Sequence, residues 1–376
     1  MKKALVLLVC VILSGTFLFG CSLTDMMGCG GTAVEPIVSD KPWSSSTDYE
    51  YISYGITRYK VDAVEGSDSY TYGDVEAEGA YSTTLVTIGG NIYQSSEIDV
   101  IKAKSAYFAD NIADKSDKLL STAPGAYSVL YTEYSLTYTD ANAKYAGKTD
   151  TMSSVVLFKT SSLVPAFSEK TQTAETSDNS YTAIADYANG KNLFTTKGKT
   201  EETSIKRDGS SFDNELLYYV VRASSSLVQG SGASIATHNS VYTGLNGSES
   251  QRNMAFATNS AHAKVSGIDP DKDGFISKYF EDGEVEYYDE TKKNDDGQIE
   301  YYKGYAIPAY YVNMQLSEQN RGWVTSLFYS TAGFNYVGDT TSKVLMQTID
   351  FETDTDGNPA YATVSLIDDY KISKLI

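Results

Sequence analysis

The chain has 376 residues, with 30 Lys and Arg against 49 Asp and Glu, so its formal net charge is −19 at pH 7. A surface this acidic repels nucleic acid and anionic lipid head groups, which argues against a role in binding polyanions. A chain of this length can bury a sufficient core without disulfides, and it has only three cysteines.

The first 20 residues have the pattern of an export signal. Lys2 and Lys3 form a positive start, an apolar run follows from Ala4 to Leu13, and Gly20 precedes Cys21. This order predicts a cleaved signal peptide. The apolar stretch is at or below the ~20 residues that a membrane-spanning helix needs.

The sequence Leu18-Phe19-Gly20-Cys21 resembles the lipobox of bacterial lipoproteins, with Leu18 at the −3 position and Gly20 at −1. The resemblance implies cleavage before Cys21 and modification of Cys21 by diacylglyceryl and a further acyl chain such as palmitate. It also implies a protein anchored by lipid on the extracytoplasmic face of the cell membrane. Each buried methylene contributes about 0.8 kcal/mol to such an anchor. The alternative is an ordinary secretory signal with a chance cysteine.

Residues 21–48 are predicted to form a flexible tether between the anchor and the body. The segment is rich in Gly, Ser, Thr and Pro, including Pro36, Pro42 and Ser44-Ser45-Ser46, a composition typical of linkers. Once Cys21 is acylated, Cys29 is the only thiol of the mature chain, so no intramolecular disulfide is expected.

Residues 49–376 are predicted to form a β-rich body. Alternating polar and apolar residues with many Tyr, Val, Ile and Thr indicate half-buried strands. Asp-Gly and Gly-Asn turns at 295–297, 356–358 and 89–91 favour tight hairpins. The predicted strands are Tyr49–Val64, Thr83–Ile88, Tyr127–Tyr138, Ser153–Lys159, Glu284–Tyr288, Ile299–Tyr302, Ala309–Leu316, Thr325–Tyr329, Val344–Phe351 and Ala360–Leu366.

Two helices are predicted, at Lys102–Leu120 and at Asp213–Val221, the second with Asp213 as a possible N-cap. The run from Leu216 to Val221 would also suit a buried strand. The fold class expected is mainly β, an antiparallel curved sheet or open half-barrel with one or two short helices. The body is one domain, or two packed units divided near residues 165–185.

The body also resembles bacterial envelope β-domains of unknown function that are similar to the half-barrel of lipoprotein carriers. The segments that carry this resemblance are 150–157, 162–165, 212–217 with Arg222, and 307–312. The resemblance implies a curved sheet around an apolar groove.

A calcium site is the strongest candidate for bound metal. Oxygen ligands at alternate positions before a glycine, Gly274, resemble an EF-hand or dockerin loop, but position 12 of the loop is Phe280 rather than an acid. The alternative is a polar turn without Ca²⁺. The candidate ligands are Asp269, Asp271, Asp273, the Phe275 carbonyl and Ser277.

A similar run, with Glu352, Asp354, Asp356 and Gly357, lies between two predicted strands and is better explained as a hairpin turn.

No residue is assigned a catalytic role. The only histidines are His238 and His262, and the chain lacks G-x-S-x-G and S-x-x-K motifs. The tyrosine pairs at 218–219, 287–288, 301–302 and 310–311 suit half-buried strands. Their outward rings could also contact sugars or a protein partner.

The sequence favours a lipid-anchored envelope protein that binds an unknown ligand or surface protein without catalysis. Two other classes remain open. One is an extracytoplasmic hydrolase of polysaccharides, which would need two acids facing each other across an aromatic cleft. The other is a structural surface protein stiffened by calcium.

Overall fold

The computed structural model describes residues 48–63, 70–88, 96–106, 109–110, 127–141, 144–187, 189–205, 211–223, 232–238, 249–266, 286–293, 299–316, 324–330, 343–354 and 358–373. The signal, residues 21–47 of the predicted tether and the predicted calcium loop lie outside these ranges.

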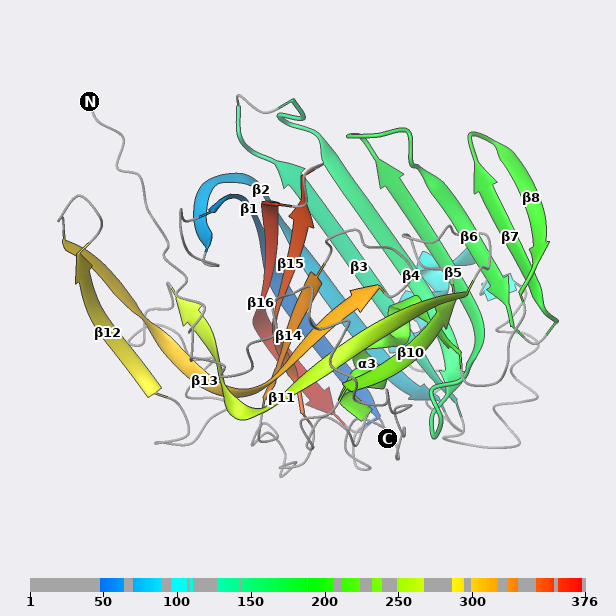
Figure 1. Cartoon of the computed structure of the whole chain (residues 1–376). Coiled ribbons are helices and arrows are strands. Elements are labelled where there is room, and N and C mark those ends of the chain that lie inside the picture. The colour runs from blue at the N-terminus through cyan, green and yellow to red at the C-terminus, as the bar shows by residue number, and fades with distance from the viewer. Residues whose placement is uncertain are drawn as a thin grey trace.

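The described strands belong to one 16-stranded sheet (Figure 1). The strands are β1 (Tyr49–Ala63), β2 (Tyr70–Ile88), β3 (Tyr127–Tyr138), β4 (Thr149–Lys159), β5 (Pro165–Ala174), β6 (Tyr181–Asp186), β7 (Lys191–Thr196), β8 (Lys199–Ser204), β9 (Phe212–Asp213), β10 (Gly232–His238), β11 (Glu249–Ser266), β12 (Glu286–Lys293), β13 (Ile299–Leu316), β14 (Val324–Ser330), β15 (Leu345–Thr353) and β16 (Pro359–Ser373). The helices are α1 (Ser96–Lys104) and α3 (Leu217–Ala223), the latter preceded by the 3₁₀ turn η4 (Asn214–Leu216).

The sheet consists of two meanders joined by the first and last strands. Its order is β8-β7-β6-β5-β4-β3-β2-β1-β16-β15-β14-β13-β11-β10-β9, with β12 paired to β13. Except for the parallel pair of β9 and β10, neighbouring strands run antiparallel. The order ends at β8 and β9, and these strands do not pair with each other in the described part of the chain. The predicted class, an antiparallel, curved and open sheet with short helices, is confirmed.

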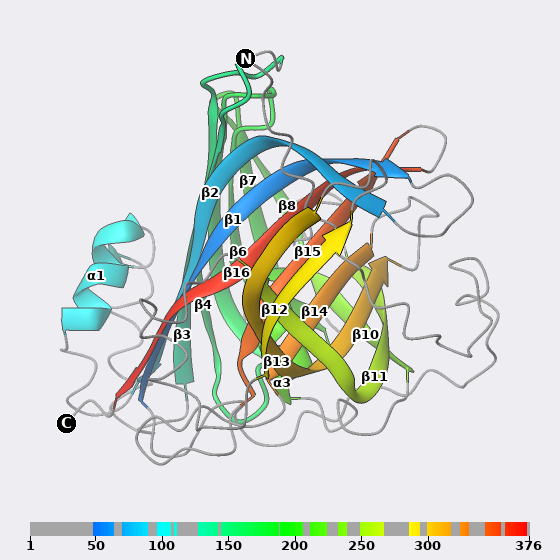
Figure 2. The same ribbon diagram turned by 90° about the vertical axis from the view of Figure 1, so that its left-hand side faces the viewer.

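Alternation of side chains gives the central strands two buried faces. On β3, Leu130 packs in the cluster around α3, whereas Val129 packs in a second cluster with Ile101 of α1. On β4, Val156 likewise packs in the cluster around α3, and Val155 packs in the second cluster. Helix α1 therefore covers the outer face of β2–β5 and α3 lies on the inner face, as Figure 2 shows.

The predicted strands are present, but several are longer and others were missed. β13 joins two predicted strands through Pro308, which lies opposite His262. Strands β5–β11 were not predicted. β8, for example, has the sequence KTEETS and side chains that are nearly all exposed, so it carries no hydrophobic alternation.

The first predicted helix is confirmed in part, although α1 already begins at Ser96. Within the predicted range, residues 102–104, 106 and 109–110 are helical, and the Ala109 N–H donates to the Ser105 carbonyl at 3.0 Å. Residues 111–126 lie outside the described part. The second predicted helix is confirmed by η4 and α3, and the strand alternative for this run is wrong. The Asp213 side chain accepts a hydrogen bond from the Glu215 N–H at 3.0 Å, the capping contact that favours a helical turn here.

Candidate functional site

The lower part of the inner face is filled by the chain's own helix. Leu216, Leu217, Val220 and Val221 are at most 4% exposed and belong to one apolar cluster with residues of both meanders. In Figure 1, α3 lies in front of the sheet, beneath β10 and β11. Each fully buried aliphatic side chain stabilises the fold by about 1.5–3 kcal/mol. The helix is thus part of the core, and the groove that the resemblance implied is occupied along this length.

A buried ion pair fixes α3 to the sheet. Arg222 Nη1 and Nη2 donate to the two carboxylate oxygens of Glu50 on β1, at 2.7 and 2.9 Å. The Tyr219 and Tyr370 hydroxyls also donate to Glu50, at 3.3 and 3.2 Å. Burial acts to lower the pKa of Arg222, but the adjacent Glu50 carboxylate outweighs it and raises this pKa above its usual value. The guanidinium therefore stays charged.

A second polar cluster connects the two meanders without strand pairing. The hydroxyls of Ser168 on β5 and Tyr187 donate to Asp213 on β9, at 2.7 and 2.5 Å. Beside them, Lys170 of β5 forms an ion pair with Glu215 of η4, and both side chains are less than one-tenth exposed. These contacts attach η4 and β9 to the inner side of β5 and β6.

A small cavity lies between α3 and the sheet. The centre of a water molecule can occupy about 10 Å³ of this cavity, which is roughly the volume needed to hold one water. This volume is too small for an acyl chain or a sugar. The cavity is lined by Ile52, Tyr54, Tyr81, Thr83, Tyr218, Tyr219, Arg222, Tyr329 and Leu345.

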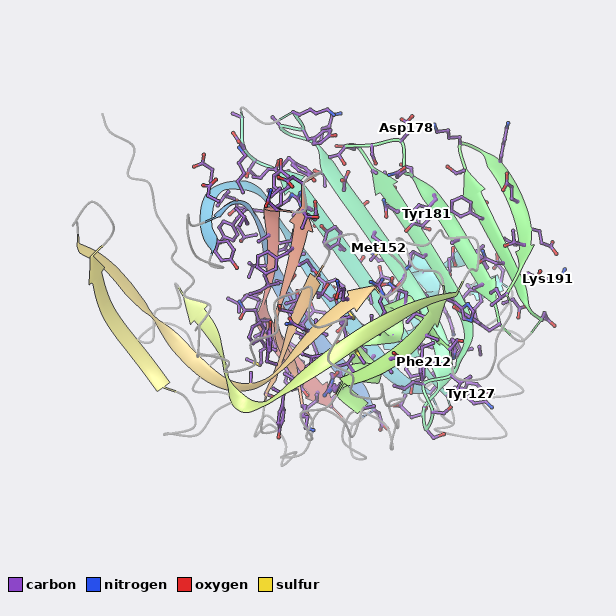
Figure 3. The ribbon with its side chains drawn as sticks, in the orientation of Figure 1. Tyr127, Met152, Asp178, Tyr181, Lys191 and Phe212 are labelled. Atoms are coloured by element: carbon purple, nitrogen blue, oxygen red, sulfur yellow. The ribbon has the colours of Figure 1, made fainter. Side chains whose placement is uncertain are left out.

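Starting at Tyr81, which packs against the α3 cluster, five side chains form a row across the inner face, which we call the tyrosine row. Direct cross-strand pairing places one residue from each of β2–β6 side by side. All are half-buried except Tyr181, which is 6% exposed. Figure 3 labels two of them, in the upper parts of β4 and β6. The row is Tyr81, Tyr134, Met152, Gln172 and Tyr181.

Tyr181, at the end of the row, places a polar group in a buried position. The Tyr181 hydroxyl is buried and makes no hydrogen bond. Burial is the main cause that raises the pKa of Tyr181 to about 12, although Lys170 acts in the opposite direction. The Tyr181 ring lies 5.7 Å from that of Phe194 on β7. An aromatic surface with an unused hydroxyl at its end can bind a ligand that is partly apolar and partly hydroxylated.

The described acids on the inner face are largely held by basic residues. Besides Glu50 and Glu215, two more acids form ion pairs, both with Arg58 of β1. Glu76 contacts Arg58 Nε at 2.7 Å, and Glu352 contacts Arg58 Nη1 at 2.5 Å. Arg58 also lies over the Tyr361 ring, 4.3 Å from its centre. These carboxylates hold strands β1, β2 and β15 together rather than facing each other across open space.

Most of the predicted site residues lie outside the described part of the chain. This applies to Cys21 and to the calcium candidates Asp269, Asp271, Asp273, Phe275 and Ser277. Within the described ranges, no three His, Cys, Asp or Glu side chains are placed to hold a metal ion.

The run at Glu352 and Asp354 joins β15 to β16, which pair antiparallel, so the hairpin prediction is confirmed.

The two histidines lie on neighbouring strands. His238 is fully buried on β10, with its ring centre 6.1 Å from that of Tyr187, and His262 lies on β11.

The tyrosine pairs lie on different kinds of element. Tyr310 and Tyr311 are neighbours on strand β13, whereas Tyr218 and Tyr219 lie on helix α3. Sequence reasoning missed Glu50 and the tyrosine row, since no local motif marks either of them.

The chain matches no protein-family model, and no curated protein matches it. One similar solved structure is a β-barrel-like protein of the domain of unknown function DUF1849 from Brucella abortus, with 6% identity and a TM-score of 0.43 over 88% of this chain and 99% of that one. Another is a "putative lipoprotein" from Parabacteroides distasonis, with 6% identity and a TM-score of 0.19 over 89% of this chain and 99% of that one. Superpositions this loose do not bear on function. Among the described helices, none has the length and apolarity to cross a membrane.

Proposed function

We propose that this is a lipid-anchored protein of the cell envelope, held through acylated Cys21 on the extracytoplasmic face, whose β-rich body binds a ligand or surface partner without catalysis. The observation that carries the binding role is the tyrosine row, with three tyrosines among its five inner-face side chains, all of them half-buried except Tyr181. The lipobox-like sequence at Leu18–Cys21 and the polar tether of residues 21–48 support the anchor.

The arrangement of acids favours binding over hydrolysis. A glycosidase needs two carboxyl groups facing each other across the substrate, one of them free to donate a proton. Glu50, Glu215, Glu76 and Glu352 are instead engaged in ion pairs. These contacts stabilise the sheet, so the four carboxylates already have basic side chains as partners.

The anchor is tested with two cysteine variants in bacteria supplied with a labelled fatty acid. We expect Cys21→Ala to lose the label and to leave the membrane fraction, because Cys21 is the acylated residue. The Cys29→Ala control should keep both properties, since Cys29 lies in the tether. Label and membrane association retained in Cys21→Ala would contradict the proposed anchor.

Ligand and metal binding are tested by native mass spectrometry of the full chain extracted from membranes, before and after a chelator. A co-purified organic mass supports a ligand-binding body. A calcium-sized adduct that the chelator removes, and that Asp271→Asn and Asp273→Asn abolish together, supports the calcium loop. A chain that carries only its acyl groups in both conditions contradicts tight binding of either kind.

A further inference from the structure

We propose that the tyrosine row is a binding site for a linear, uncharged glycan. This inference rests on the proposed binding function and names the chemical class of the ligand. The C–H faces of sugar rings stack on aromatic rings, while their hydroxyls need hydrogen-bond partners. The row supplies aromatic rings at Tyr81, Tyr134 and Tyr181. It also supplies the Gln172 amide, whose Nε2 donates to the Asn179 carbonyl at 3.4 Å and whose Oε1 can accept from a sugar hydroxyl.

The spacing of the row suits an extended chain ligand. Its members are direct cross-strand partners on five adjacent strands, from β2 to β6. Neighbouring strands lie ~4.8 Å apart, so Tyr81 and Tyr181 are separated by roughly 19 Å. A linear glycan of several sugar residues could lie across the strands and meet one side chain at each step.

The hydroxyl of Tyr181 is the feature that points most directly to a hydroxylated ligand. It is buried without a hydrogen-bond partner, a state that costs stability. A sugar oxygen that reaches this hydroxyl would remove the cost. Because the hydroxyl is covered in the free protein, binding at this end requires the Tyr181 or Phe194 side chain to change rotamer, a common adjustment at binding surfaces.

The charges around the row favour a neutral ligand. Lys170, on the same face of β5 as Gln172, is already paired with Glu215. The chain as a whole carries a net charge of −19, which repels an anionic polysaccharide. An uncharged glycan avoids this repulsion.

The side chains next to the row on β3 and β4 are held by a hydrogen bond. The adjacent inward-facing positions of β3 and β4 are Thr132 and Ser154, whose hydroxyls are buried and hydrogen-bonded to each other at 2.6 Å. Side chains held in this way lose less entropy when a ligand binds.

The test measures binding of full-length protein in detergent to uncharged oligosaccharides of different linkage, namely cello-, xylo-, manno- and malto-hexaoses, by calorimetry. Polygalacturonate serves as the anionic comparison. We expect at least one neutral oligosaccharide to bind, and polygalacturonate to bind more weakly or not at all. Binding of polygalacturonate alone, or of none of the neutral oligosaccharides, would overturn the proposal.

Two variants and their matched controls locate the site. Tyr181→Phe should weaken binding about 3- to 10-fold, the loss expected for one hydrogen bond, and should not lower the melting temperature. Tyr134→Ala should weaken it about tenfold or more. Tyr51→Phe and Tyr51→Ala make the same changes on the outer face of β1 and should leave binding unchanged. Equal effects of the changes at Tyr51 and in the row would refute the assignment.

The outcomes also separate this inference from the proposed function. If the protein from membranes carries an organic mass that is not a glycan, or captures a surface protein, while all the oligosaccharides fail to bind, the glycan site is wrong and the binding function stands. If neither test finds a bound species, both fail.

Discussion

Glu50 and Arg222 show how one contact decides where a segment lies. Both side chains are almost completely buried, and each is the other's charged partner. A buried ion pair is not by itself strongly stabilising, because both charges lose their hydration. The contacts place the last turn of α3 against the start of β1 and the end of β16.

We therefore expect strong coupling between the two residues. Arg222→Met leaves the Glu50 charge buried without its partner and should lower the free energy of unfolding by about 3–5 kcal/mol. Glu50→Met should cost a similar amount. The double variant should cost clearly less than the sum of the two, because no charge remains unpaired. Urea unfolding of the four proteins measures this, and additive losses would contradict the coupling.

At the scale of the elements, close approach between strands depends on single glycines. A Cβ built on Gly79 of β2 would lie 1.9 Å from the backbone oxygen of Ser135 on β3, well inside van der Waals contact. Gly55 of β1 has no atom within 4 Å of the corresponding position. Two glycines on paired strands thus have opposite roles: one permits packing and the other only adds freedom to the unfolded chain.

Substitution by alanine should separate these roles. Gly79→Ala forces β2 and β3 apart and should cost at least about 2 kcal/mol of unfolding free energy. Gly55→Ala is the matched control and should leave stability unchanged or raise it by up to about 1 kcal/mol. Denaturant unfolding of both variants checks this. A harmless Gly79→Ala would mean that the two strands can separate at little cost.

For the whole molecule, the pairing of the first and last strands joins the two meanders. β1 and β16 pair along nearly their full lengths, with a register shift only at Ser53/Tyr54. The largest apolar cluster contains residues of β1–β4 from one meander and of β13–β16 from the other, packed around α3. The meanders therefore share one core, although each is continuous in sequence.

This shared core predicts a single cooperative unfolding transition. Scanning calorimetry of the protein should show one peak, and loss of β-sheet circular dichroism should coincide with it. The division near residues 165–185 stays a prediction. Residues in that range form β5 and β6, which pair with each other, and two separate peaks would support the division.

The local features of this protein can be predicted from its amino-acid sequence alone. The period-2 alternation predicted most of the long strands, because a strand with one buried face repeats every second residue. Asp213 predicted the start of the α3 segment, because a cap is a contact between near neighbours. The lipobox-like sequence predicted the anchor in the same local way.

The contacts between distant residues, in contrast, depend on the three-dimensional arrangement of the strands and helices. Glu50 and Arg222 are 172 positions apart, and no pattern around either residue names the other. The tyrosine row depends on the register of five strands, in which a shift of one residue would turn each side chain to the opposite face. Edge strands such as β8 carry little apolar alternation because solvent rather than a core surrounds them. Alternation fixes which face a side chain takes, whereas the long-range pairing of strands fixes its neighbours.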